Sequence, residues 1–232
     1  GVVNVGSFAF AECDALESIY IPASVTSFPV TAISSDGALE SITVAADNAC
    51  FISIDGNLYS KDGKTLLRYA AGKKDTSFTL PDGVTTVGDG AFGGCTSLES
   101  VALCEGLKII GGSAFAGCTA LSEISLPENL ATIGSGAFSG CTALVQITVP
   151  DGVTQLGSSA FWGCRGLESA VIGTGVTQIK ASTFNGCISL TGIELHGFIV
   201  SVDGSAFNGC PAITEFTVSA DNEYYCAVNG NL

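Results

Sequence analysis

The stretch from Ala137 to Gly157 reads AFSGCTALVQITVPDGVTQLG, and variants of this phrase recur every 23 residues along the chain. Three residue types mark the repeat: Phe92, Phe115, Phe138, Phe161, Phe184 and Phe207; Cys95, Cys118, Cys141, Cys164, Cys187 and Cys210; and Leu98, Leu121, Leu144, Leu167 and Leu190, followed by Ile213. A fixed period of this length is typical of proteins in which each repeat is one coil that contacts only its neighbours. The sequence therefore predicts an elongated stack of coils.

Each unit contains two segments with strand character and one turn-forming segment. Residues around Ile147 and Val149 alternate apolar with polar, as in a strand with one buried face. Pro150 ends this strand because proline cannot donate to a ladder, and residues 153–157 can form a second short strand. The A-F-x-x-C phrase has helical spacing but is too short for a stable helix, so we expect a short helical turn there, with 3₁₀ geometry as one option.

The repeat predicts nine parallel strands whose central residues point into one shared interior. These core residues are Ile19, Ile42, Phe78, Val101, Ile124, Ile147, Ala170, Ile193 and Phe216. One early repeat is irregular, because Ile33 replaces phenylalanine and Asp36 replaces cysteine. We divide the chain into repeats at 1–45, a β-hairpin insert at 46–77, repeats at 78–219, and the start of a second, truncated hairpin module at 220–232.

The insert carries the signals of a β-hairpin. Turn sequences at 55–57 and 61–64 frame two candidate strands, at 58–60 and 65–69. Its first part recurs near the C-terminus at a constant shift of 174 residues, so that Asn48 matches Asn222 and Phe51 matches Tyr225. We therefore expect a second module to begin at 220. Because the chain has no Met and begins inside a repeat, we also expect it to be a piece of a longer protein.

The charge balance excludes several classes of partner. The chain has 22 acidic and 8 basic side chains, which give a formal net charge of −14. Nucleic acid and anionic membrane surfaces require basic footprints, so neither is an expected partner. No apolar run approaches the roughly 20 residues that cross a bilayer, and we expect no membrane insertion by this fragment. Five of the bases gather at Lys61, Lys64, Arg68, Lys73 and Lys74.

The cysteines predict core packing rather than a metal site. Six of the ten recur once per coil and should form a ladder in which each lies above the last. A zinc site needs four ligands around one point, usually with C-x-x-C spacing, and the chain has no C-x-x-C. Buried free cysteine behaves as a small apolar residue, so we interpret the ladder as reduced thiols. The pairing of Cys50, Cys104 and Cys226, which lie outside the repeat frame, stays open.

No catalytic, cofactor or metal site is predicted. His196 is the only histidine, and it stands where proline usually follows the strand, without any motif around it. The carboxylates form no dense cluster of the kind that calcium loops require, and a hairpin turn explains residues 55–57. The glycine-rich phrases are turns between coils, and none has the lysine and hydroxyl of a phosphate-binding loop.

Three surfaces are candidates for ligand contact. The first is the outward face of the strands, where Glu123, Gln146, Thr148, Glu194 and Glu215 flank the core residues; a solvated sheet face explains the same residues. The second is Trp162, in a position filled elsewhere by Gly93, Ala116, Ser139, Asn185 and Asn208, and so expected to be partly exposed. The third is the basic hairpin, with Tyr59, Arg68 and Tyr69, because inserts in repeat arrays often carry contacts.

These phrases resemble the BspA-like, treponeme-type leucine-rich repeat family. The resemblance covers nearly the whole chain and rests on the 23-residue period, the A-F-x-x-C-x-x-L and I-P-x-x-V-x-x-I-G phrases, and the D-N-x-x-[FY] hairpin insert. It implies a right-handed leucine-rich repeat solenoid of parallel strands, short helical turns and an inserted hairpin. It also implies a secreted or cell-surface protein of a bacterium or protist, with adhesion among the functions of some members and no catalytic residues.

The leading hypothesis is therefore a non-enzymatic extracellular binding or adhesion module that recognises host proteins, glycans or other cells. An extended stack offers a large display surface and no enclosed pocket that excludes water. The alternative is a structural spacer that displays other domains of a larger surface protein. We expect a monomer without cofactors. An enzyme would need a cluster of titratable residues that the sequence does not contain.

Overall fold

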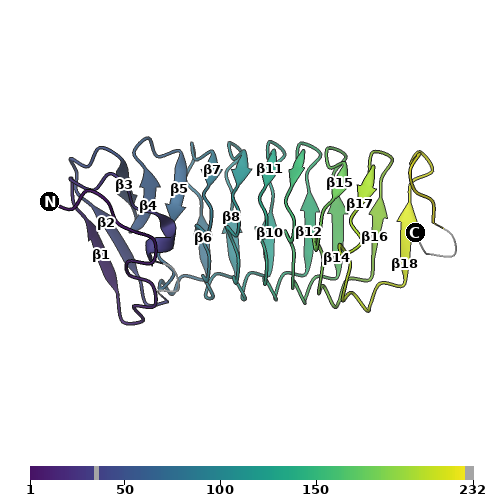
Figure 1. Cartoon of the computed structure of the whole chain (residues 1–232), viewed down its shortest axis with the longest axis horizontal. Coiled ribbons are helices and arrows are strands. Elements are labelled where there is room, and N and C mark those ends of the chain that lie inside the picture. The colour runs from purple at the N-terminus through teal and green to yellow at the C-terminus, as the bar shows by residue number, and fades with distance from the viewer. Residues whose placement is uncertain (34–36, 228–232) are drawn as a thin grey trace.

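The computed structural model describes residues 1–33 and 37–227, which form one elongated stack of coils (Figure 1). The replacement of cysteine by Asp36 and the last part of the predicted second hairpin module, 228–232, lie outside the described residues. Over the described ranges, no helix combines the length and the apolar character needed to cross a bilayer.

One side of the stack is built from nine strands, one per coil. They are β1 (Ser18–Ile21), β2 (Ser41–Val44), β6 (Ser77–Thr79), β8 (Ser100–Ala102), β10 (Glu123–Ser125), β12 (Gln146–Val149), β14 (Ser169–Ile172), β16 (Gly192–Leu195) and β18 (Glu215–Val218). Their ladders are parallel and shifted by one repeat, so that Ile19 lies opposite Ile42 and Ile147 opposite Ala170. All nine predicted core residues lie in these strands, which confirms the predicted coil stack.

A second side is formed by two-residue strands from the V-x-x-I-G phrase. They are β7 (Thr86–Val87), β9 (Ile109–Ile110), β11 (Thr132–Ile133), β13 (Gln155–Leu156), β15 (Gln178–Ile179) and β17 (Ser201–Val202). Strands β7 to β13 form one continuous parallel ladder, whereas β15 and β17 pair only with each other. The predicted second strand is thus present in the six units from β7 to β17, with an interruption in pairing between β13 and β15.

The insert joins this second side instead of projecting from it. Strands β3 (Phe51–Ile54), β4 (Asn57–Ser60) and β5 (Thr65–Arg68) pair in antiparallel fashion in that order, which confirms the hairpin of β4 and β5. Strand β5 then pairs in parallel with β7, with Leu66 opposite Val87. The insert therefore supplies a strand of the array itself. The boundaries of the four chain segments stay a prediction.

Two asparagines tie the insert and its C-terminal counterpart to the preceding coil. The Asn48 side chain donates to the carbonyls of Pro22 and Val25, 2.9 Å each, and its oxygen accepts from the next backbone amides, of Cys50 and Phe51. Asn222 makes the same four bonds, donating to His196 and Ile199 and accepting from Tyr224 and Tyr225. The sequence match at a shift of 174 residues is therefore also a match of hydrogen bonds.

The A-F-x-x-C segment is not helical, so the expected helical turn is wrong. Its backbone amides alternate between two kinds of partner: Cys95 donates to Phe92 within its own coil, whereas Phe92 and Gly94 donate to Ala114 and Ala116 of the next coil. In a continuing helix, the amides beyond the first turn would instead donate to carbonyls four residues earlier in the same coil. Gly94 also has a φ of 76°, which a helix cannot contain. Among the described residues, the one helical element is a single 3₁₀ turn, Val30–Ile33.

The interior of the stack is a column of aromatic rings. Successive rings from Phe92 to Phe207 lie 4.7, 5.1, 5.5, 5.3 and 5.5 Å apart and nearly parallel. Tyr69 precedes Phe92 by one repeat and extends the column, with its ring 5.3 Å from that of Phe92. Five of the rings, from Phe92 to Phe184, are fully buried. The column makes the core continuous along this part of the stack.

The predicted cysteine ladder runs beside the ring column, and its thiols act as hydrogen-bond donors. Five of its six thiols, those from Cys118 onward, donate to the carbonyl of a phenylalanine 26 residues earlier, as from Cys118 to Phe92 at 3.1 Å and from Cys164 to Phe138 at 3.1 Å. The same bond recurs at Cys141, Cys187 and Cys210. The six cysteines of the ladder are free thiols, and so are Cys50, Cys104 and Cys226 outside it. Burial raises the pKa of Cys118 and Cys164 to about 12.

Glycine after the second strand allows neighbouring coils to approach. A Cβ at Gly157 would lie 2.3 Å from the backbone nitrogen of Ser135, and one at Gly134 would lie 2.5 Å from that of Gly112. At this separation the Gly157 amide donates to the Ile133 carbonyl over 2.8 Å. A side chain at Gly157 would therefore require the neighbouring backbone to shift.

We predict that Gly157→Ala destabilises the protein by about 2–4 kcal/mol, because its methyl group would overlap the backbone of the preceding coil. Gly204→Ala is the matched control, since a Cβ there has nothing within 4 Å. Urea denaturation of both variants measures the difference. Equal stability of the two variants would contradict this account of coil spacing.

The thiol ladder predicts that stability falls at alkaline pH. Unfolded cysteines ionise at about pH 8.5, whereas Cys118 and Cys164 keep their protons until about pH 12 when folded. The stabilisation is complete below pH ~8.5, and above it the unfolded state gains about 1.4 kcal/mol per pH unit for each such thiol.

Urea midpoints at pH 7.5, 8.5 and 9.5 in the presence of a reductant measure this effect. A Cys118→Ala, Cys164→Ala variant should lose less stability over the same interval. A wild-type midpoint that is constant from pH 7.5 to 9.5 would refute the role of the protonated thiols.

Candidate binding surface

The outward face of the first-side strands presents the residues that the sequence singled out. Side chains alternate along a strand, so the residues on either side of each buried core residue point away from the interior. Glu123 on β10, Gln146 and Thr148 on β12, Glu194 on β16 and Glu215 on β18 are all exposed. The fold therefore brings these five side chains to one face of the stack.

Two open grooves cross this outer strand face. One, of about 320 Å³, runs over β8 and β10 and has Ser100, Glu105 and Glu123 in its lining. The other, of about 330 Å³, runs over β14, β16 and β18 and contains both Glu194 and Glu215. Gln146 and Thr148 line neither groove. The predicted glutamates therefore form two separate acidic sites on this face, with Glu123 in one groove and Glu194 and Glu215 in the other.

The outer strand face consists mostly of small side chains, which together with the glutamates determine the charge and polarity that it offers to a ligand. None of the residues that flank the strand cores from β6 to β18 is basic. Gly192 leaves its part of the second groove open, and Thr191 and Thr214 add hydroxyls to the lining. The repeat frame places Gly192 one residue before a strand core and so on the outward face, whereas nothing in the repeat marks Thr191 and Thr214 as lining residues. The face can offer carboxylates and hydroxyls to a cationic or polar ligand.

The hairpin patch predicted from Tyr59, Arg68 and Tyr69 is not a surface, and that prediction is wrong. The three residues are 1%, 5% and 1% exposed, respectively. Because β5 joins the second side of the stack, Arg68 points inward and donates to the carbonyls of Gly90, at 2.7 Å, and Ile33, at 3.4 Å. Burial, assisted by the charge of Asp55, raises the pKa of Tyr59 to about 12.

Tyr69 belongs to the core for the same reason. It continues the phenylalanine column, and burial together with the nearby charge of Asp75 raises its pKa. Its hydroxyl donates to Asp75 over 3.3 Å, and the Lys73 ammonium lies 5.3 Å from its ring centre. The insert therefore contributes packing, while its basic side chains stay near the surface, with Lys61, Lys64 and Lys74 exposed.

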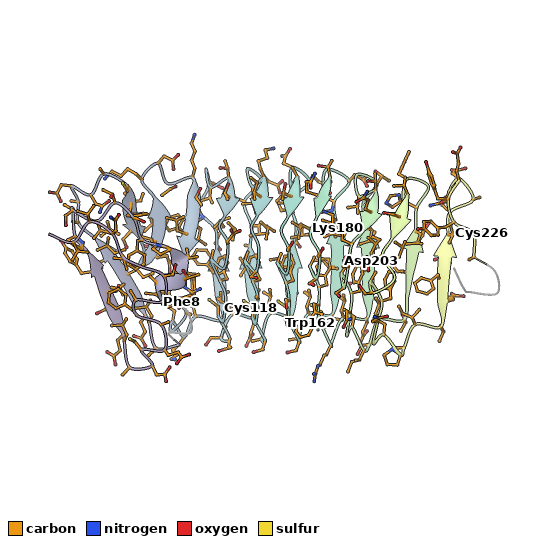
Figure 2. The ribbon with its side chains drawn as sticks, in the orientation of Figure 1. Phe8, Cys118, Trp162, Lys180, Asp203 and Cys226 are labelled. Carbon is orange, nitrogen blue, oxygen red and sulfur yellow. The ribbon has the colours of Figure 1, made fainter. Side chains whose placement is uncertain are left out.

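Trp162 is 50% exposed, as its position in the repeat predicts. It lies in the turn between β13 and β14, away from both grooves, and its backbone carbonyl accepts from Gly140 of the preceding coil (Figure 2). The indole therefore stands apart from the outer strand face. Its role as a contact stays a prediction.

The ring and the backbone carbonyl of His196 both accept hydrogen bonds within the fold. Its Nδ1 accepts from the backbone amide of Phe198 over 3.2 Å, and its carbonyl accepts from Asn222. Over residues 1–33 and 37–227, no three histidine, cysteine or acidic side chains come together as a group that can hold a metal ion.

The comparisons with known proteins agree on one family. The chain matches the BspA type leucine-rich repeat region in six copies, over residues 1–62, 69–172 and 108–226. No curated protein sequence matches it.

Three solved bacterial structures illustrate the fold. A leucine-rich cell surface protein from Faecalibacterium prausnitzii is 30% identical, with a TM-score of 0.67 over 89% of this chain and 48% of its own. The pneumococcal vaccine antigen PcpA is 28% identical, with a TM-score of 0.80 over 95% and 55%. A leucine-rich repeat protein from Eubacterium ventriosum is 27% identical, with a TM-score of 0.70 over 93% and 63%. The chain thus spans about half the length of the first two.

The exposed fraction of the Trp162 side chain predicts the emission of the indole and its quenching by iodide. Because it is the only tryptophan, the native emission should resemble that of a partly hydrated indole and should be quenched by iodide. Titration with iodide before and after unfolding measures this. Native emission that is blue-shifted and resistant to iodide would show that the indole is buried.

Proposed function

The chain belongs to the BspA-type leucine-rich repeat family, and we propose that it is a non-enzymatic binding module of a bacterial cell-surface protein. The proposed ligand is a host protein or glycan, held in an adhesive contact outside the cell. Two structural relatives support this location, since one is described as a cell surface protein and another as a vaccine antigen.

The observation that carries the proposal is the outer strand face. Its side chains are held in rows by parallel ladders, as where Glu194 lies opposite Thr217 and Gly192 opposite Glu215. A rigid face loses little conformational freedom when it binds, which favours recognition by many modest contacts. The two grooves make this face uneven. Because both are open to solvent, they suit contact with the surface of a macromolecule better than the enclosure of a small substrate.

The charge of the face defines the kind of partner that it favours. Glu123 projects into one groove, and Glu194 and Glu215 project into the other. Basic patches on a partner protein would complement both positions and would accelerate encounter at low salt. Binding through this face should therefore weaken as the ionic strength rises.

A spacer role is the second candidate, and the continuous ring column supports it. Rings from Tyr69 to Phe207 stack without interruption, so bending this part of the stack would separate contacts in the core. A spacer needs this rigidity but no particular outer face. The two functions therefore differ in whether the outer face is required.

The test compares two triple variants of equal charge. Glu123→Gln, Glu194→Gln, Glu215→Gln changes the outer strand face. Glu99→Gln, Glu128→Gln, Glu168→Gln removes three exposed carboxylates that line neither groove. Binding to immobilised fibronectin, laminin, collagen and mucin is measured at low and physiological salt.

We expect the first variant to lose about tenfold in affinity for at least one of these proteins, since three exposed charge pairs together contribute about 1.4 kcal/mol. The second should stay within about twofold of the wild type. Equal loss in both variants, or no binding by the wild-type protein, would refute the outer-face site and leave the spacer role as the better account.

A further inference from the structure

The sequence F-N-G-C occurs at the same position of two neighbouring coils. It places Asn185 before Gly186 and Asn208 before Gly209. The two glycines have nearly the same backbone conformation, with φ values of 78° and 73°. The two asparagines therefore share their local sequence and the conformation of the glycine that follows them.

The two turns differ in the hydrogen bond of the glycine amide. Gly186 donates to the carbonyl of Asn208 in the next coil over 2.8 Å. The same bond forms in an earlier turn, from Gly140 to Trp162 at 2.7 Å. In the described structure, the Gly209 amide makes no hydrogen bond. Its nitrogen is therefore not held by a neighbouring coil.

The two turns also differ in exposure. Asn208 and Gly209 are both exposed, whereas Asn185 and Gly186 are half-buried between coils. Solvent therefore has better access to the Gly209 amide. An exposed amide without a partner also needs less free energy to leave its native conformation than one that is bonded between coils.

We propose that Asn208 is a site of spontaneous deamidation, and that the neighbouring coil protects Asn185 from the same reaction. Asparagine is among the thermolabile residues of proteins, and glycine after it leaves the backbone nitrogen unhindered because glycine has no Cβ. The reaction needs only water. It does not depend on the function proposed for the outer strand face.

The reaction begins at the backbone nitrogen of Gly209. This nitrogen loses its proton to solvent and attacks Cγ of Asn208, so that an N–Cγ bond forms. The Cγ–Nδ2 bond breaks, and the leaving nitrogen takes up a proton from water and departs as ammonia. Water then opens the cyclic imide either at Cγ, which gives aspartate, or at the backbone carbonyl carbon of Asn208, which gives isoaspartate.

Both products add a negative charge to the turn, and isoaspartate also lengthens the backbone by a methylene group. The turn lies between two core contacts. The Phe207 ring stacks on that of Phe184 at 5.5 Å, and the Cys210 thiol donates to the Phe184 carbonyl over 3.0 Å. A longer backbone between Phe207 and Cys210 shifts one contact relative to the other, so isoaspartate should loosen this coil.

The test follows both asparagines in one sample of the folded protein. The protein is kept at 37 °C and pH 8 with a reductant, and samples are then cleaved after glutamate at pH 4, where deamidation is slow. Asn185 falls in the peptide 169–194 and Asn208 in the peptide 195–215. Mass spectrometry measures the converted fraction of each peptide, and a parallel sample in 8 M urea measures both rates without the fold.

We expect Asn208 to be converted about tenfold faster than Asn185 in the folded protein, because Gly186 must first break its bond to the next coil. In urea, the two rates should agree within about twofold, since both then depend on the same F-N-G-C sequence. Asn208→Ser should remove the reaction from the peptide 195–215. Hydrogen exchange in that peptide should be faster in aged wild-type protein than in the aged variant.

Three results would overturn the proposal. They are equal conversion of Asn185 and Asn208 in the folded protein, a tenfold difference that persists in urea, and no conversion of Asn208 in the folded protein while the urea sample is converted. Equal hydrogen exchange in the two aged proteins would refute the loosening of the coil. A third Asn-Gly pair, at 229–230, lies outside the described residues and falls in a separate peptide, 224–232, so it does not affect the comparison.

Discussion

The structure depends on one constraint: neighbouring coils must lie at about the spacing of hydrogen-bonded strands. Parallel strands require backbones about 4.8 Å apart, and the rings of the interior column keep to nearly the same interval, from 4.7 to 5.5 Å. Both contacts hold only if each residue lies over its equivalent in the preceding coil. The 23-residue period is the expression of this requirement in the sequence.

The same constraint explains why so much of the fold could be predicted. Phe138 and Cys141 recur because each position meets the same neighbours in every coil, and the structure places both in continuous columns. The exposed positions were predictable for a related reason, since Glu194 and Glu215 flank core residues on strands of known direction. Periodicity therefore defines the inward and outward directions, but it does not define what the outward residues bind.

Prediction failed where the period is locally broken. The insert has strand-like alternation, and its tyrosines and arginine resemble surface contacts when they are considered as an isolated hairpin. Pairing of β5 with β7 makes the hairpin part of the array and turns Arg68 into the interior. One signal was present in the sequence, because Tyr69 lies one period before Phe92. The turn segment failed for another reason: its spacing is helical, but half of its amides bond to the neighbouring coil.

In an array of near-identical coils, departures from the repeat are where distinct surface chemistry arises. A regular coil has glycine after its second strand, and the next backbone fills the space beside it. Lys180 and Asp203 replace that glycine in the next two coils; the Asp203 amide keeps the bond to the preceding coil over 2.8 Å, whereas the Lys180 amide does not make it. Across the coils where this bond is missing, the ring column from Phe161 to Phe184 continues unbroken at 5.3 Å. A solenoid can therefore lose a strand pairing at its surface without losing the continuity of its core.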